Sequence, residues 1–269
     1  MPSLDTFLGR NPATVLIEII GAQGSTPRET GTFMLVSAKD IWGTIGGGQF
    51  EFLAIANARA MLQGGGVELM DIPLGPEIGQ CCGGRTQLRC RFATAGILAG
   101  LQQRLEDEAQ DWPQVTLFGA GHVGRALAAA LITLPVRTTV VETRQEELDE
   151  LPPGTVTRLL AMPEALVADL PAGSVVLILT HDHALDFLVA KEALARGDLA
   201  YVGMIGSATK RATFSSWLAR EGGDRAWLDR LTLPIGGTTV RDKRPEVIAA
   251  MTTAEILTRL ALYRSRSSS

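Results

Sequence analysis

The chain has 269 residues with 25 Lys or Arg and 29 Asp or Glu, so its net charge is -4. This length suits two domains of ordinary size, and the near balance of charge argues against a nucleic-acid partner, because binding phosphates requires a basic face. No apolar run reaches membrane-spanning length and the N-terminus lacks the pattern of a signal peptide, so we expect a soluble, cytoplasmic protein without a membrane partner.

The first part of the chain is predicted to consist of short strands separated by glycine loops. Residues 14–22 and 32–38 are rich in β-branched and apolar residues, and the loop GSTPRETG lies between them. We therefore expect a hairpin-like pair. Residues 49–63, with their alanines and long apolar side chains, are predicted to form a helix that buries one broad face.

Two further strands are expected at 67–74 and 85–92. In the second, Leu88, Cys90 and Phe92 alternate with Gln87, Arg89 and Arg91, and in that register Cys90 faces the core. Cys90 is then a small buried hydrophobe rather than a functional thiol.

Two glycine loops of this part are rich in backbone donors. Gly46, Gly47 and Gly48 lie at the start of the predicted helix, and a helix N-terminus favours binding of an anion. The guanidinium group of Arg28 could also bind this anion. A tight strand-to-helix turn explains the three glycines equally well. Glu51, in the first helical turn, complements the helix dipole in either case.

The stretch GQCCGG places Cys81 and Cys82 between glycines, with Arg85 close in sequence. Accessible sulfurs, backbone amides and a nearby cation are the conditions for a reactive thiol. A disulfide between neighbours would be strained and would leave Cys90 unpaired, and without a second cysteine pair a tetrahedral metal site is not expected. A structural turn with incidental thiols stays open as the alternative.

The charged helical stretch 96–113 ends at Pro113, and we place the domain boundary there, between domains 1–112 and 113–269. Beyond it, apolar strand-like runs alternate with helical segments, which indicates a parallel sheet buried on both faces. The predicted fold class is α/β, with an N-terminal α+β domain followed by a Rossmann-like doubly wound parallel sheet domain. A helix is expected at 244–263, and the polar tail 264–269 is expected to be disordered.

A glycine motif opens this second domain. Gly119, Gly121 and Gly124 form a G-x-G-x-x-G after a predicted strand and before an alanine-rich helix, and Glu142 ends the next strand. This context indicates that a diphosphate binds at the helix N-terminus and that Glu142 meets ribose hydroxyls. The alternative is a Rossmann domain that keeps the loop only for packing.

Two of the three histidines lie in THDHALD, which leaves the fourth strand of this domain at its carboxyl end. His181 and His183 are predicted to contact a ligand there, and His122 is expected to line the same crevice. Their spacing is not a specific metal-ligand pattern, so contact with a ligand, or helix capping by Asp182 and Asp186, is favoured over metal binding.

Several motifs, in their order and spacing, resemble the xanthine dehydrogenase accessory proteins of the XdhC/CoxI family. The resemblance covers nearly the whole chain and rests on the following stretches: GSTPRETG, GTIGGGQFE, GQCCGG, FGAGHVG, THDHALD, YVGMIGSATKR, and PIGG followed by RPEVIAAMTTAEIL. It implies a family-specific N-terminal domain, a C-terminal Rossmann domain and a homodimer.

The resemblance also implies a function in maturing a molybdenum hydroxylase. Such a chaperone binds the molybdenum cofactor in its molybdopterin form, holds it while a cysteine desulfurase provides the terminal sulfido ligand, and passes it to apo-xanthine dehydrogenase. Cys81 and Cys82 match the family's cysteine motif, Gly46–Gly48 with Glu51 match its triple-glycine motif, and Gly119, Gly121 and Gly124 match its nucleotide loop.

No general base with a positioned partner is evident in the sequence, which favours a binding and delivery protein over an enzyme. Two alternatives stay open. The glycine loop and Glu142 would suit an NAD-dependent oxidoreductase, and they would equally suit a noncatalytic, nucleotide-sensing dimer.

Overall fold

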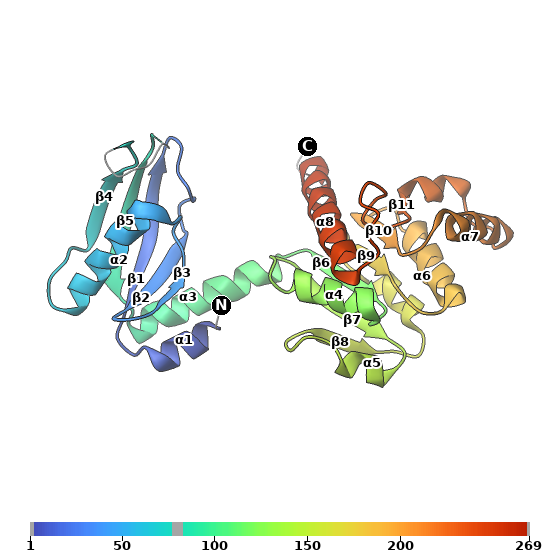
Figure 1. Ribbon diagram of the computed structural model, residues 1–269, viewed down its shortest axis with the longest axis horizontal. Helices are drawn as coiled ribbons and strands as arrows, with labels where there is room; N and C mark the ends of the chain where they lie inside the picture. The colour runs from blue at the N-terminus through green and yellow to red at the C-terminus, as the bar shows by residue number, and fades with distance from the viewer. Residues whose placement is uncertain (1–2, 77–82, 268–269) are drawn as a thin grey trace. The chain divides into compact units, whose positions relative to one another are not determined.

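The computed structural model describes residues 3–76 and 83–267, and Cys81 and Cys82 lie outside the described residues. The chain forms two compact units, Met1–Arg104 and Leu105–Ser269 (Figure 1). The division falls within helix α3 (Ala95–Gln110), whereas the sequence analysis places the boundary just after this helix, at Pro113.

The N-terminal unit is built on a five-stranded antiparallel sheet with the order β3-β2-β1-β5-β4. The strands are β1 (Thr14–Gln23), β2 (Phe33–Ser37), β3 (Ile41–Gly43), β4 (Leu69–Pro73) and β5 (Arg85–Phe92). Helix α1 (Leu4–Arg10) precedes the sheet, and α2 (Gly48–Leu62) connects β3 to β4. The predicted hairpin of β1 and β2 is confirmed.

Both faces of this sheet are covered. On one face α2 contributes Phe50, Ala54 and Ala58 to a core with Ile17 and Cys90. On the other face Phe7 of α1 and Leu101 of α3 pack with Leu16 and Leu35. Successive residues of β1 are therefore buried on opposite faces, as the period of two of a strand requires.

The side chain of Cys90 is fully buried, as predicted, whereas Phe92, which alternates in phase with it, is exposed. Phe92 is the last residue of β5 and is 53% exposed, because on this strand the core around α2 ends at Cys90. The alternation of apolar and polar residues therefore continues along β5 for two residues after the part of the strand that packs against α2.

The C-terminal unit contains a six-stranded parallel sheet with the order β11-β10-β9-β6-β7-β8. Its strands are β6 (Gln114–Phe118), β7 (Arg137–Glu142), β8 (Val156–Leu159), β9 (Val175–Ile178), β10 (Tyr201–Met204) and β11 (Leu231–Thr232). The helices are α4 (His122–Leu131), α5 (Gln145–Asp149), α6 (His183–Ala195), α7 (Ala208–Arg220) and α8 (Pro245–Ser267), with 3-10 helices η2 (Pro163–Asp169) and η3 (Arg225–Arg230).

This strand order is that of the doubly wound Rossmann sheet, and it confirms the predicted fold class. The chain moves outward from β6 to β8 and then returns to β9, so the order reverses between β6 and β9. One face of the sheet packs against α4 and α8 through residues such as Leu127 and Ile256, and the other packs against α6 and α7 through Phe187 and Phe214 (Figure 1). Ligands of such sheets bind at the carboxyl ends of the strands, next to this reversal.

The last helix is longer than the sequence predicts. Helix α8 continues to Ser267, so the expected disorder is wrong for residues 264–267. Arg264 and Arg266 lie in the last helical turn, where positive charge interacts favourably with the helix dipole. Across residues 3–76 and 83–267, no helix combines the length and apolar character needed to cross a membrane.

Candidate functional site

In the N-terminal unit, the segment 24–28 lies against two glycine-containing segments, 46–48 and 83–84. A Cβ atom on Gly84 would lie 2.2 Å from the carbonyl oxygen of Ser25, and one on Gly46 would lie 2.7 Å from Cγ of Pro27. Only glycine permits such close approach of two chain segments. We call these three segments the loop cluster, and Gly83 and Gly84 in it directly follow the two cysteines in sequence.

Glu51 determines the shape of the triple-glycine loop. Its Oε2 atom accepts hydrogen bonds from the backbone N–H groups of Ile45, at 3.0 Å, and Gly47, at 3.1 Å. The N–H of Gly46 donates to Oγ1 of Thr44 at 3.2 Å. The amides of Gly46 and Gly47, two of the donors that the sequence suggests for an external anion, thus bond to Thr44 and to Glu51 of α2.

The outer side of the loop cluster is open. A Cβ atom on Gly47 or Gly83 would meet no atom within 4 Å, and both glycines have positive φ angles, of 75° and 66°. Arg28 is exposed beside Gly46, and no carboxylate of the described residues forms an ion pair with it. A ligand can therefore approach the backbone here and meet one guanidinium group.

Arg85 has a different partner from the one expected. It forms a bidentate ion pair with Asp71, with distances of 2.6 and 2.7 Å, and hydrogen bonding from Arg85 lowers the pKa of the Asp71 carboxyl. The positive charge that the sequence suggests for thiolate stabilisation is thus matched by an acid on β4. The geometry of Cys81 and Cys82 themselves lies outside the described residues.

In the C-terminal unit, the glycines of the G-x-G-x-x-G loop have distinct functions. Gly119 has φ of 118°, and a Cβ atom there would lie 2.5 Å from the carbonyl oxygen of Leu179. On Gly124 it would lie 2.2 Å from the carbonyl oxygen of Gly119, whereas on Gly121 it would meet nothing within 4 Å. Gly121 is also the N-cap of α4 and provides no side-chain cap. The N-terminus of α4 is therefore accessible to an anion.

Glu142 is 5% exposed at the end of β7 and bonds to the glycine loop. Its Oε2 accepts from the N–H of Ala120 at 3.0 Å and its Oε1 from the N–H of Thr143 at 2.8 Å. Burial raises the pKa of Glu142, but these two amides and the Arg144 guanidinium outweigh burial and lower the pKa overall. A ribose that bound to Glu142 would have to share this carboxylate with the loop.

A buried ion pair, which the sequence analysis missed, lies at the same edge of the sheet. Asp186 is fully buried, its Oδ2 contacts Nζ of Lys210, and Nζ also donates to the carbonyl of Ile205 at 2.9 Å. Oδ1 of Asp186 accepts from the N–H and hydroxyl of Thr180, at 3.1 and 2.7 Å. The pair therefore connects the segment after β9 to the segment after β10. In the sequence, the position of Lys210 shortly after a predicted strand was the one sign of this pair.

The predicted site histidines are exposed. His181 lies on the surface, and the side chain of His183 is 78% exposed, with Nδ1 3.9 Å from Oδ2 of Asp186. His122 begins α4 and lines a groove of about 540 Å³ that α4 forms with α8. Asp182 caps α6 by accepting from the N–H of Ala184 at 2.8 Å, which confirms the expected capping for this acid, whereas Asp186 bonds to Thr180 and Lys210 instead. No cluster of three or more metal-ligating side chains occurs in the described part of the chain.

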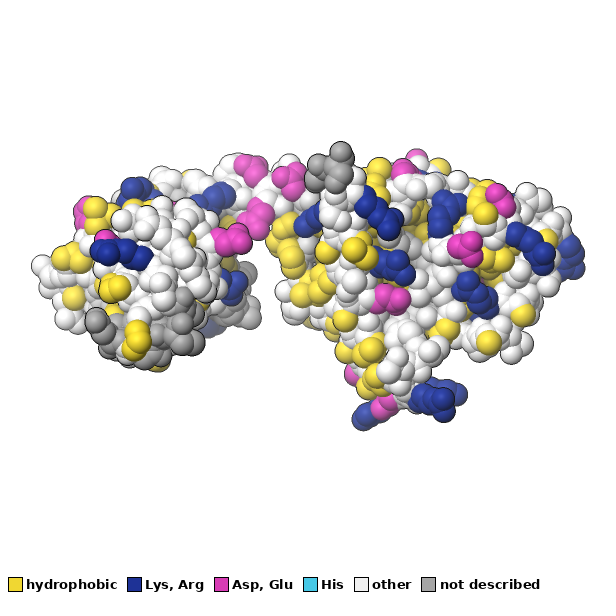
Figure 2. All heavy atoms as spheres, turned by 90° about the horizontal axis from the view of Figure 1, so that it is seen from above, with side chains coloured by type: hydrophobic (Ala, Val, Ile, Leu, Met, Phe, Trp, Pro, Cys, Tyr) yellow, Lys and Arg dark blue, Asp and Glu magenta, His cyan; other side chains and the backbone are white. Residues whose placement is uncertain are grey.

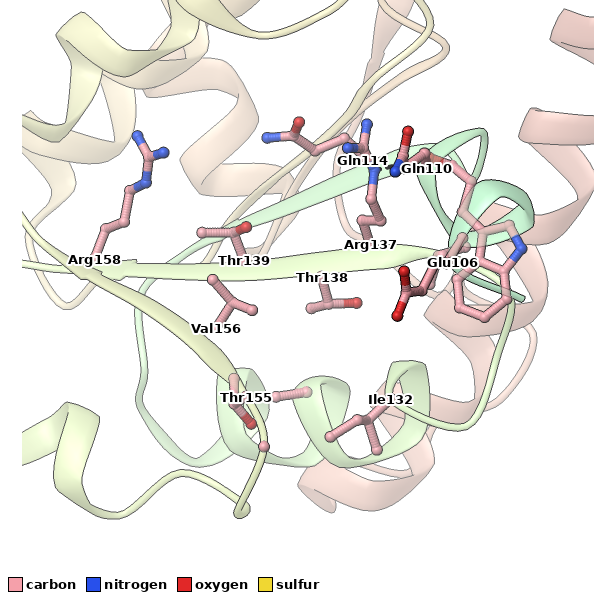
Figure 3. Close-up of a pocket in the computed structure, with 15 residues that line it drawn as sticks. Glu106, Gln110, Gln114, Ile132, Arg137, Thr138, Thr139, Thr155, Val156 and Arg158 are labelled. Carbon is pink, nitrogen blue, oxygen red and sulfur yellow. Dashed lines mark hydrogen bonds between the residues drawn. The ribbon is translucent and has the colours of Figure 1, made fainter. Parts of the chain in front are cut away.

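A separate groove of about 750 Å³ opens beside α4, β7 and β8 (Figure 3). Figure 3 shows Thr138, Thr139 and Val156 along its strands and Ile132 on the helix side. Arg137, at the start of β7, lies on the same wall as Gln114 at the start of β6. The groove thus includes the amino ends of these strands, at the other end of the sheet from the glycine loop.

Comparison with known proteins gives consistent results for both units. The family model for the XdhC Rossmann domain matches residues 115–256, and the model for the XdhC and CoxI family matches residues 8–73. The chain is 28% identical over 258 residues to the uncharacterized protein YqeB of Escherichia coli K12. This alignment covers 92% of the chain but only 44% of YqeB, so the chain spans less than half of that relative.

A solved structure has the same fold. The crystal structure described as a xanthine dehydrogenase from Bacillus halodurans superimposes with a TM-score of 0.75 at 18% sequence identity, covering 99% of this chain and 96% of that one. At this identity the likeness concerns the fold alone. Because the XdhC Rossmann domain model alone covers more than half of the chain and the second model matches the N-terminal unit, the protein belongs to the XdhC and CoxI family.

Proposed function

We propose that this protein is a carrier for a molybdopterin-type molybdenum cofactor. It holds the cofactor while a cysteine desulfurase provides the sulfur for a terminal sulfido ligand, and it then delivers the cofactor to apo-xanthine dehydrogenase. The observation that carries the proposal is the loop cluster: in a chain of the XdhC and CoxI family, the segment 24–28 lies against both 46–48 and 83–84, and Gly83 and Gly84 directly follow Cys82 in sequence.

The chemistry of the loop cluster suits this cargo. A molybdopterin has a phosphate tail, a planar pterin and a soft metal–sulfur end, and it therefore needs a charged donor, open backbone and a soft ligand. Arg28 would bind the phosphate, and the open sides of Gly47 and Gly83 leave room for a flat ring system. Cys81 and Cys82 would take the soft end, since thiolates are the protein ligands that soft metals prefer.

The residues of the cluster have binding roles in this proposal, and none is catalytic. Glu51 keeps the triple-glycine loop in shape through the amides of Ile45 and Gly47. Delivery requires binding and release rather than turnover, so no general base is needed. The carrier would act as a homodimer in the cytoplasm.

A second function is favoured by the glycine loop of the C-terminal unit. The uncapped N-terminus of α4 beside Gly121 suits a diphosphate, so this unit would bind NAD or another nucleotide. Saturable NADH binding with hydride transfer to a small substrate would make the protein an NAD-dependent oxidoreductase. A nucleotide-dependent change in association without pterin binding would make it a noncatalytic sensor.

Cofactor retention tests the leading proposal. Purified protein is incubated with molybdenum cofactor, unbound material is removed, and bound pterin is measured by fluorescence after oxidation. We expect retention above that of a control protein. Arg28→Gln should lower it, whereas Arg89→Gln, which changes an exposed arginine on β5, should not. Retention no higher than that of the control protein would refute the proposal.

A further inference from the structure

A second cavity lies at the opposite end of the C-terminal sheet from the glycine loop. It has a volume of about 490 Å³ and is lined by Tyr201, the first residue of β10. Its other walls come from the end of α6, from η3 and β11, and from the last turns of α8. Among the described residues, one acid, Asp229, lines it together with four arginines: Arg196, Arg230, Arg259 and Arg266. We call it the arginine cavity.

Two of these arginines have structural bonds. Arg196 forms a bidentate pair with Asp198, at 2.9 and 2.7 Å, which neutralises its charge. Arg230 donates to the carbonyl groups of Leu194, at 2.6 Å, and of Arg196, at 3.1 Å, and so caps the end of α6. Carbonyl groups carry no net charge, and the positive charge of Arg230 is therefore still available at the cavity.

The other two arginines lie on one stripe of α8. Arg259 and Arg266 are seven residues apart, two helical turns, with Leu262 and Tyr263 between them on the same cavity wall. Among the described residues no carboxylate forms an ion pair with either arginine. Figure 2, viewed from the side at which α8 ends, shows several Lys and Arg side chains on this face of the C-terminal unit.

The nearest acid on α8 is bound elsewhere. Glu255 lies one turn before Arg259, but its Oε2 accepts from the hydroxyl of Tyr201 at 2.8 Å and from the N–H of Gly236 at 3.0 Å. Burial, together with the charge of Glu255, raises the pKa of Tyr201, so the phenol keeps its proton and its bond to Glu255. The helix dipole accounts for a basic residue at Arg266, in the last turn, but not for Arg259.

We propose that the arginine cavity binds a small molecule that carries a phosphate or diphosphate group. Guanidinium groups bind phosphate oxygens through paired hydrogen bonds, and three arginines that have no carboxylate ion-pair partner among the described residues line this cavity. The volume lies within the range of small-molecule sites, and the walls come from several elements, so a compact ligand would be enclosed. This site is independent of the cofactor proposal and of the crevice at Gly121.

Pyrophosphate binding to the full chain tests this proposal by titration calorimetry. All variants carry Gly121→Asp, which places a negative charge at the open glycine and so removes anion binding in the crevice. In this background we expect saturable binding that weakens as salt is added. Arg259→Gln and Arg266→Gln should each raise the Kd by about tenfold, and the matched control Arg220→Gln, on exposed α7, should not.

Thermal unfolding of each variant without ligand shows whether the fold is retained, and Arg230 is left unchanged because it caps α6. Equal Kd values for the Gly121→Asp protein and its two α8 arginine variants would overturn the proposal. Tighter binding of a poly-glutamate peptide than of pyrophosphate, with the same dependence on Arg259 and Arg266, would also overturn it, because the surface would then recognise an acidic protein segment.

Discussion

The two acids in the glycine motifs have parallel structural functions. Glu51 accepts backbone amides of the triple-glycine loop, and Glu142 accepts the N–H of Ala120 in the G-x-G-x-x-G loop. In both places a carboxylate of the chain itself holds a loop that the sequence analysis treats as an anion site. A ligand of these loops would therefore bind to a preformed backbone, whose shape depends on an internal acid.

Replacing Glu142 by Gln should destabilise the protein and reduce its sensitivity to acid. The folded-state pKa of Glu142 is lowered, so its contribution is present above the unfolded pKa of about 4.3 and is lost as the pH falls toward the folded value. At neutral pH we expect a loss of about 1–3 kcal/mol. Urea unfolding at about pH 7 and about pH 3 measures this, and a difference that does not shrink in acid would contradict the assignment.

At the scale of elements, the glycine loop before α4 contains one glycine that the fold requires and one that is open to a ligand. Gly119 has a positive φ and contacts the backbone after β9, whereas Gly121 has φ of -65° and open space around it. The first position thus depends on glycine for the fold, and the second does not. One substitution at each position distinguishes these functions.

Gly119→Ala should cost about 3 kcal/mol or more, since the new Cβ atom would overlap the carbonyl of Leu179. Gly121→Ala should cost no more than about 1 kcal/mol and should instead weaken binding of any nucleotide at α4. Chemical denaturation and nucleotide titration measure the two effects. A fully stable Gly119→Ala protein would show that the loop tolerates a shift that this geometry excludes.

The ion pair of Asp186 and Lys210 connects the ends of β9 and β10. Lys210→Met should cost about 3–5 kcal/mol, because it leaves a buried carboxylate without a counter-charge. Adding Asp186→Asn should restore part of the loss, since Asn keeps an acceptor for the N–H of Thr180. As a control, Lys191→Met, which removes a partly exposed pair with Glu221, should cost at most about 1 kcal/mol. Equal losses in the two single variants would argue against the buried pair.

The sequence predicts these elements better than it predicts their contacts. Hydrophobic periodicity located β1, β5, α2 and the doubly wound sheet, because each signal lies within one short window. The short strand β3 was missed, since three residues carry no period. Lys210 and Asp186 are 24 residues apart, and only the folded sheet brings them together. The meeting of the three N-terminal glycine loops was likewise invisible, as it depends on antiparallel pairing across distant strands.

At the scale of the whole molecule, the chain consists of two compact units with separate cores. The antiparallel sheet positions the loop cluster, and the parallel sheet positions the glycine loop at the N-terminus of α4. The proposed functions divide in the same way, with the molybdenum cofactor in the first unit and a nucleotide in the second. Each unit has its own hydrophobic core and should unfold as a cooperative body of its own.

Calorimetry of the full chain should therefore show two unfolding transitions. Cys90→Ala, which removes a buried sulfur from the core of the N-terminal unit, should lower only the transition of that unit. Lys210→Met should lower only the other one. A single transition with equal calorimetric and van't Hoff enthalpies would contradict this independence.

In the proposed function, Cys81 and Cys82 of the cysteine motif hold the molybdenum cofactor. Pterin retention by the Cys81→Ala, Cys82→Ala and Cys90→Ala variants tests it most directly, with circular dichroism to show that each variant is folded. We expect substitution of Cys81 or Cys82 to lower retention, whereas Cys90→Ala, in the buried core, should retain as much as the unmodified protein and lose only stability. Equal retention by all three variants would contradict the claim and would make GQCCGG a structural turn.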